Sequence, residues 1–98
     1  MYKNQINKLK TKLYIFHPYS GQGGADLSIS RLINGLDKDK YEIDFLSLNL
    51  PLIRKKIFKK IKYYQIKSTR TIFSFSQIKK YILNDNKKYK KKIFISNQ

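Results

Sequence analysis

Residues 12–26 constrain the fold more than any other part of this chain. A short apolar run at residues 13–16 ends abruptly and is followed by Pro18 and then by three closely spaced glycines. An amphipathic stretch begins immediately after those glycines. A strand, a glycine-rich loop and a helix N-terminus in this order form a unit whose backbone amides can approach a phosphate or a sugar hydroxyl.

The rest of the sequence predicts alternating strands and helices. Apolar and aromatic residues cluster or alternate as in strands over residues 12–16, 41–48, 61–66 and 93–96. An apolar stripe at helical spacing predicts one helix from Ala25 to Leu36, and a Ser/Thr-rich cap predicts a second over residues 69–83. The order β-α-β-β-α-β predicts an α/β fold with a partial Rossmann-like parallel sheet.

The length and composition indicate one small domain. The 98 residues divide into a lysine-rich lead-in, residues 1–11, which we expect to be frayed, and a domain over residues 12–98. The chain has no cysteine, which excludes a disulfide framework and fits the cytoplasm, the compartment that we expect. One histidine and six carboxylates predict no metal site and no cofactor, and no apolar run approaches the roughly 20 residues of a membrane span.

The net charge of +16 suggests an anionic partner, either nucleic acid or an anionic membrane surface. Lysine, isoleucine, asparagine and tyrosine together fill about half of the chain, however, as in proteins from AT-rich genomes. Arginine, which grips phosphates and bases better than lysine, occurs only at Arg31, Arg54 and Arg70. We therefore favour a compositional origin of the charge and do not expect nucleic acid as a partner.

The glycine-rich segment excludes two common phosphate sites. Counted from Gly21, the sixth position of a dinucleotide fingerprint is Asp26 instead of glycine, and the second predicted strand ends without a ribose-binding acid. The Gly-Lys-Ser/Thr ending of a P-loop is also missing. Two interpretations remain: Gly23 and Gly24 bring the first helical amides close to a ligand, or they only form a tight turn.

A longer series of motifs favours the ligand. Residues 21–27 are Gly-Gln-Gly-Gly-Ala-Asp-Leu, residues 32–36 are Leu-Ile-Asn-Gly-Leu and residues 41–46 are Tyr-Glu-Ile-Asp-Phe-Leu. Their order and spacing resemble the opening of family 4 glycosyltransferases, which begins with a strand, a Gly-Gly-Ala-Glu loop, a helix ending in Ala-Asn-Gly-Leu and a second strand. Asp26 stands where that family usually has glutamate. The resemblance continues at residues 67–74 and 93–98.

The resemblance implies the N-terminal domain of a GT-B enzyme, which transfers a sugar from a nucleotide-sugar donor to a glycan or lipid-linked acceptor without an essential metal. It implies that Gly23 and Gly24 face the donor, and that Tyr19, Ser20 and Gln22 line the acceptor side. The donor-binding C-terminal domain of that family has no counterpart in these 98 residues. We therefore expect a truncated transferase that is inactive by itself.

Parallel strands bring their carboxyl ends to one edge, where ligands of such sheets bind. Four segments are predicted to meet there: residues 17–24, 47–51, 67–71 and 96–98. Arg70 and Asn97 are weaker candidates for that edge.

Other residues have a functional and a structural interpretation. His17 follows the first strand and is a weak candidate for a catalytic base, but the sequence reveals no partner, so we favour a loop histidine. The alternation of the second strand makes Asp44 solvent-facing. Tyr63 and Tyr64 could stack on sugars, although packing on a sheet face is more common.

Residues 51–62, from Pro51 to Lys62, resemble a basic amphipathic helix of the kind that lies on membranes. This segment would hold the protein peripherally on the inner face of the cell membrane. The alternative is a solvated loop that leads into the third strand. The rival hypothesis for the whole chain is a small basic protein that binds nucleic acid or an anionic membrane surface.

Overall fold

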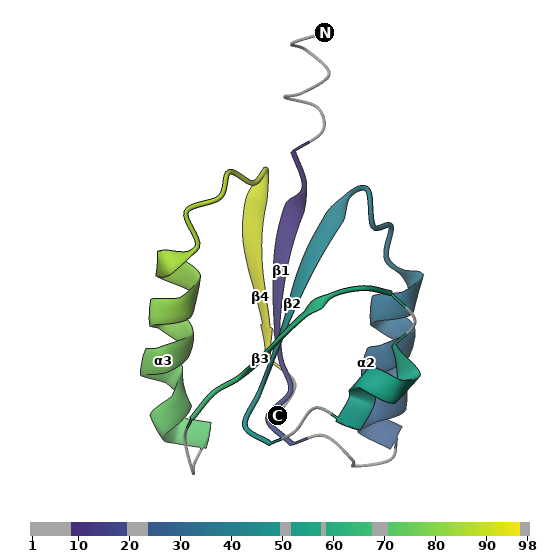
Figure 1. Ribbon diagram of the computed structural model, residues 1–98, viewed down its shortest axis with the longest axis vertical. Coiled ribbons are helices and arrows are strands. Elements are labelled where there is room, and N and C mark those ends of the chain that lie inside the picture. The colour runs from purple at the N-terminus through teal and green to yellow at the C-terminus, as the bar shows by residue number, and fades with distance from the viewer. Residues whose placement is uncertain (1–8, 20–23, 50–51, 58, 68–70, 97–98) are drawn as a thin grey trace, which may run out of the picture.

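Four parallel strands form the centre of the structure, in the spatial order β3-β2-β1-β4 (Figure 1). The computed structural model describes residues 9–19, 24–49, 52–57, 59–67 and 71–96. Along the chain, the elements are β1 (Thr11–Phe16), α2 (Gly24–Gly35), β2 (Tyr41–Ser47), the 3₁₀-helix η1 (Leu52–Lys56), β3 (Lys62–Gln65), α3 (Thr71–Asn84) and β4 (Lys91–Ser96). This is the predicted α/β fold with a parallel sheet, compatible with a partial Rossmann-like fold.

Helices cover the sheet on both sides, α2 and η1 on one face and α3 on the other (Figure 1). Parallel sheets are usually covered on both faces because the crossover connections run over them. All six residues of β1 are buried. Side chains that alternate along β1 therefore enter two different cores.

The first core lies between the sheet and the pair α2 and η1. It contains aliphatic side chains from all these elements together with one aromatic ring, namely Leu13, Ile15, Ile29, Ile33, Ile43, Phe45, Ile53 and Ile57. Tyr63 of β3 packs against this cluster, with its ring 5.7 Å from the ring of Phe45. The second core lies under α3 and contains Tyr14, Phe16, Leu46, Leu48, Ile66 and Ile78.

The prediction for Asp44 is wrong, and the two covered faces of the sheet explain why. Asp44 is only 2% exposed, because alternation along β2 turns its side chain toward α3 and not toward solvent. Residues 52–56 form a 3₁₀-helix in which Ile53 is fully buried, and Ile57 after it is 8% exposed. The apolar side chains at these two positions belong to the core.

The boundaries of the elements differ little from the prediction. β1 starts at Thr11, one residue before the expected domain start, and β4 starts at Lys91, two residues before its predicted start. Most of the predicted lead-in, residues 1–8, lies outside the described residues. Within the described part of the chain, no helix is long and apolar enough to span a membrane.

Candidate functional site

The carboxyl ends of the strands meet at one edge of the sheet, as the parallel topology requires (Figure 1). The amide of His17 donates to the carbonyl of Leu46 (3.0 Å), and the amide of Leu48 donates to the carbonyl of Pro18 (2.8 Å). The amide of Ile66 donates to the carbonyl of the last residue of β2 (2.7 Å). The segments that leave β1, β2 and β3 are thus joined by backbone hydrogen bonds at this edge.

His17 and Asp26 form a buried pair at the same edge. The Nε2 atom of His17 lies 2.7 Å from Oδ1 of Asp26, and the two residues are 3% and 2% exposed. His17 directly follows β1 and Asp26 lies in the first turn of α2. The pair therefore connects the two ends of the glycine-rich segment. The sequence pattern did not reveal this partner of His17.

The pair accounts for the acid that breaks the dinucleotide fingerprint. The Asp26 carboxylate is directed into the protein, where the imidazole of His17 binds it, and the ring of Phe45 packs 6.0 Å from that imidazole. A carboxylate also suits the first turn of a helix, because the amides there carry partial positive charge. A histidine with a carboxylate partner has the composition of a general base. His17 is only 3% exposed, and the pair joins the end of β1 to the first turn of α2.

The other predicted site residues are described only in part. The side chain of Tyr19 is 45% exposed beside this edge. Gly24 is exposed as the first residue of α2, and a Cβ atom added there would meet no other atom within 4 Å. The remaining candidates lie outside the described residues: Ser20, Gln22, Gly23, Arg70 and Asn97.

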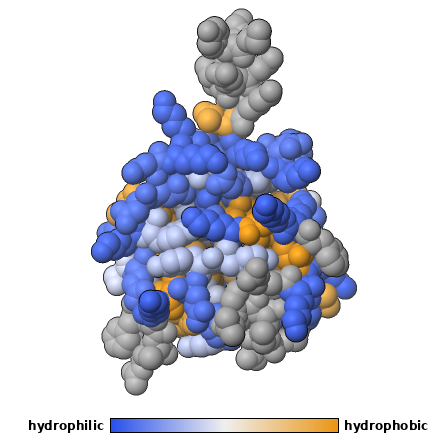
Figure 2. Space-filling model, in the orientation of Figure 1, coloured by the Kyte–Doolittle hydropathy of each residue, from blue (hydrophilic) through white to orange (hydrophobic). Residues whose placement is uncertain are grey.

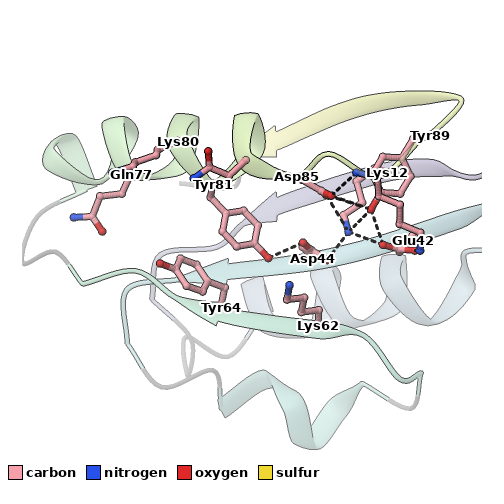
Figure 3. A pocket seen from close by; sticks show the side chains of 12 residues that line it. Lys12, Glu42, Asp44, Lys62, Tyr64, Gln77, Lys80, Tyr81, Asp85 and Tyr89 are labelled. Atoms are coloured by element: carbon pink, nitrogen blue, oxygen red, sulfur yellow. Dashed lines mark hydrogen bonds and ion pairs between the residues drawn. The ribbon is translucent and has the colours of Figure 1, made fainter.

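A second polar cluster surrounds Lys12 on the α3 face of the sheet (Figure 3). The Nζ atom of Lys12, whose side chain is 3% exposed, lies 2.7 Å from Glu42 and 2.8 Å from Asp44. Asp85, after α3, is 3.6 Å away. Three of the six acidic residues of the chain therefore share one buried ammonium group.

Tyrosine hydroxyls also donate hydrogen bonds to these acids. Tyr14 donates to Asp85, and Tyr81 donates to Asp44, each at 2.7 Å. Tyr89 donates to Glu42 at 2.8 Å. The ring of Tyr81 also packs against two other tyrosines, edge-on to Tyr14 (6.2 Å) and stacked on Tyr64 (4.6 Å). These contacts place Tyr64 on a sheet face, which is the structural interpretation of this residue.

Burial and the ion pairs shift the pKa values of the cluster in opposite directions. Burial alone would lower the pKa of Lys12, but hydrogen bonds with Asp44 and Glu42 raise it well above its usual range. Burial alone would raise the pKa of Glu42, but hydrogen bonds from Lys12, Lys87 and Tyr89 lower it to about 2. Burial and the bond to Glu42 raise the pKa of Tyr89 to about 12. All these groups therefore keep their neutral-pH charges over a wide range.

The Lys12 cluster lines a cavity of about 640 Å³. Its charges are paired with one another, so the cluster fastens β1, β2 and the segment after α3 together. In the sequence, Lys12 directly precedes the apolar run of β1, and the parallel register aligns it with Glu42. Asp85 lies 73 positions after Lys12, and no pattern in the sequence indicates that contact.

Neither cluster has the composition of a metal site. Across the described ranges, no group of three or more histidine, cysteine, aspartate or glutamate side chains has a geometry that could hold a metal ion. The carboxylates around Lys12 are occupied by its ammonium group and by tyrosine hydroxyls.

No protein family, no curated protein and no solved structure matched the chain.

Proposed function

We propose that this chain is the N-terminal, acceptor-side part of a glycosyltransferase of the GT-B type. The reaction is transfer of a sugar, of the hexosyltransferase kind, from a nucleotide-sugar donor to a glycan or lipid-linked acceptor. A second, donor-binding domain is needed for turnover, and no essential metal is expected. The proposal assigns the protein to the cytoplasm and to glycan biosynthesis for the cell envelope.

The proposal starts from the motif series at residues 21–27, 32–36 and 41–46. In the structure, the described residues of these motifs lie at the start of α2, at its end and along β2. An alternating α/β topology with a parallel sheet is the arrangement that the GT-B type requires. Ligands of such sheets bind beyond the carboxyl ends of the strands, which is where the glycine-rich segment leaves β1.

The observation that carries the proposal is the environment of Gly24. This residue begins α2 at the carboxyl edge, is exposed, and has open space where a side chain would be. The nearby acid, Asp26, is bound by His17 inside the protein. The carboxylate of Asp26 therefore does not extend toward a ligand. The first amides of α2 are suited to bind a phosphate or a sugar hydroxyl.

The test is a ¹⁵N–¹H NMR titration of the 98-residue chain. The probes are UDP-glucose, UDP-galactose, UDP-N-acetylglucosamine and GDP-mannose, each with and without short oligosaccharides. The proposal predicts that at least one probe shifts the amide signals of Tyr19, Gly24 and Asn49, at the carboxyl edge. A complete lack of shifts there with every probe, or stronger binding of a short DNA duplex, would refute it.

A further inference from the structure

Lysine residues gather at the edge of the sheet formed by the amino ends of the strands, opposite the candidate site. The amino ends of β1, β2 and β4 are level, because Thr11 pairs with the first residue of each of the other two strands. The amide of Lys90 donates to the carbonyl of Lys10, and the amide of Thr11 donates to the carbonyl of Lys40, each at 2.8 Å. Lys40, Lys10 and Lys90 therefore lie next to one another, each directly before one of three adjacent strands.

The segment before β3 adds two more lysines to this edge. Lys59 and Lys60 line a hollow of about 730 Å³ together with Lys10 and Lys38. Figure 2 shows hydrophilic side chains over this upper part of the molecule, around the amino ends of the strands. Four separate segments thus contribute to what we call the lysine edge, and each of them lies just before a strand.

The charges of the lysine edge are mostly uncompensated. Lys87 binds Glu42, and Lys92 binds the carbonyl groups of Ile82 and Asp85. Within the described residues, no ion pair engages the other eight lysines of this edge, which are Lys10, Lys38, Lys40, Lys59, Lys60, Lys88, Lys90 and Lys91. The exposed carboxylates nearby are those of Asp37 and Asp39. Positive charge is therefore in large excess.

Neither folding nor composition accounts for this placement. Like charges held close together repel one another, so Lys40, Lys10 and Lys90, each just before one of three adjacent strands, do not favour folding. A general preference for lysine in the composition would also place similar numbers of lysines at the two edges of the sheet. At the carboxyl edge, however, the described residues 17–19, 47–49, 66–67 and 96 include one lysine, Lys67. The asymmetry indicates an anionic partner at the lysine edge.

We propose that the lysine edge binds an anionic membrane surface. Its cations are lysines, which act as point charges on a diffuse anionic surface, whereas arginine is the better residue for bidentate contacts to nucleic acid. No arginine lies among the residues described at this edge, and the two tyrosines there, Tyr41 and Tyr89, are half-buried and not free to stack on bases. Leu9, next to Lys10, is 37% exposed and supplies an apolar side chain for the lipid interface.

This attachment fixes the orientation of the molecule and does not depend on the proposed function. β1 has six residues, so the carboxyl edge lies roughly 20 Å from the membrane surface when the lysine edge rests on it. An acceptor that meets the carboxyl edge must then extend that far from the lipid. Neighbouring strands lie about 4.8 Å apart, which is less than the screening length of about 8–10 Å, so charges at the starts of adjacent strands act on the surface together.

The test is co-sedimentation of the 98-residue chain with phosphatidylcholine vesicles that contain 0 or roughly 30% phosphatidylglycerol. A quadruple variant replaces four exposed lysines of the edge: Lys38→Gln, Lys40→Gln, Lys88→Gln and Lys90→Gln. The matched control removes the same charge elsewhere and carries Lys55→Gln, Lys56→Gln, Lys67→Gln and Lys79→Gln. Circular dichroism checks that both variants fold.

We expect the original chain to bind only the anionic vesicles and to be released at high salt. The edge variant should lose roughly tenfold or more in its partition coefficient, because each lysine near an anionic leaflet strengthens binding several-fold, and the control should lose much less. Equal losses in the two variants would overturn the proposal, as would salt-insensitive binding to neutral vesicles. Tighter binding to a 30-base-pair DNA duplex than to the vesicles would also overturn it. If a variant fails to fold, the salt and lipid dependence of the original chain and the DNA comparison still decide.

Discussion

The imidazole of His17 lies 2.7 Å from a carboxylate oxygen of Asp26, and this contact connects the end of β1 to the first turn of α2. Both side chains are buried, where water is excluded, so each provides a hydrogen-bonding group for the other. The pair should therefore have a measurable effect on stability.

Replacing Asp26 tests this role. Asp26→Ala should lower the free energy of unfolding by about 1–3 kcal/mol, because the buried imidazole of His17 loses its partner. Asp26→Asn keeps an oxygen at the same place and should lose less. Urea unfolding followed by circular dichroism measures both. Equal stability of Asp26→Ala and the original chain would show that the contact contributes nothing.

The Lys12 cluster should be more sensitive to loss of its cation than to loss of one hydroxyl. Lys12→Met leaves three carboxylates without their shared ammonium group and should cost about 3–5 kcal/mol. Tyr81→Phe removes only the bond to Asp44 and should cost about 1–3 kcal/mol. Urea unfolding at neutral pH gives both values. A larger loss in Tyr81→Phe than in Lys12→Met would contradict the proposed network.

The same cluster predicts an acid-sensitive part of the stability. Since the folded protein lowers the pKa of Glu42 from 4.5 to about 2, its contribution is present above about pH 4.5 and is lost as the pH falls toward 2. Glu42→Gln should be less stable than the original chain by about 1–3 kcal/mol at pH 7, since its carboxylate is partly exposed, and the two should converge near pH 2.

Urea titrations at pH 7, 4 and 2.5 measure that difference. The matched control is Asp39→Asn, which removes an exposed carboxylate that forms no ion pair within the described residues. Its difference from the original chain should stay small at all three values. A Glu42→Gln difference that does not shrink in acid would argue against the assigned ion pairs.

The segment after β2 offers a test of core packing. Ile53 of η1 is fully buried against the α2 face, so Ile53→Ala should cost about 2–5 kcal/mol. Leu83, which is 67% exposed on α3, is the control, and Leu83→Ala should change the stability by less than about 0.5 kcal/mol. Thermal melts compare the two. An unchanged melting temperature in Ile53→Ala would favour an apolar face available to membranes.

Sequence reasoning recovered the order of the elements because each strand and helix carries its own local pattern of apolar residues. It assigned Asp44 to solvent because alternation reports only two faces and does not say whether both are covered. It also missed the partner of His17. Asp26 lies nine positions later, and only the folded turn between β1 and α2 brings the two side chains together.

The structure buries Ile53 and Ile57, two of the apolar positions on which the membrane-helix interpretation of residues 51–62 rested. The four-residue spacing of the isoleucines predicts an apolar face, but it does not distinguish a face that packs on the protein core from one that lies on a membrane. The candidate site is predictable to the level of its edge, because all-parallel strands bring their carboxyl ends together whatever the side chains are. The distribution of lysines between the two edges becomes visible only once that topology is known.

The most direct test of the central claim, that the start of α2 faces the donor, uses two glycines that are equally open. Neither Gly24 nor Gly35 has an atom within 4 Å of an added Cβ, so Gly24→Ala and Gly35→Ala should both fold. NMR titration with the nucleotide-sugar that shifts the original chain most compares their dissociation constants. We predict at least roughly tenfold weaker binding by Gly24→Ala, corresponding to about 1.4 kcal/mol, and unchanged binding by Gly35→Ala. Equal affinity of the two variants would contradict a ligand-facing backbone at Gly24.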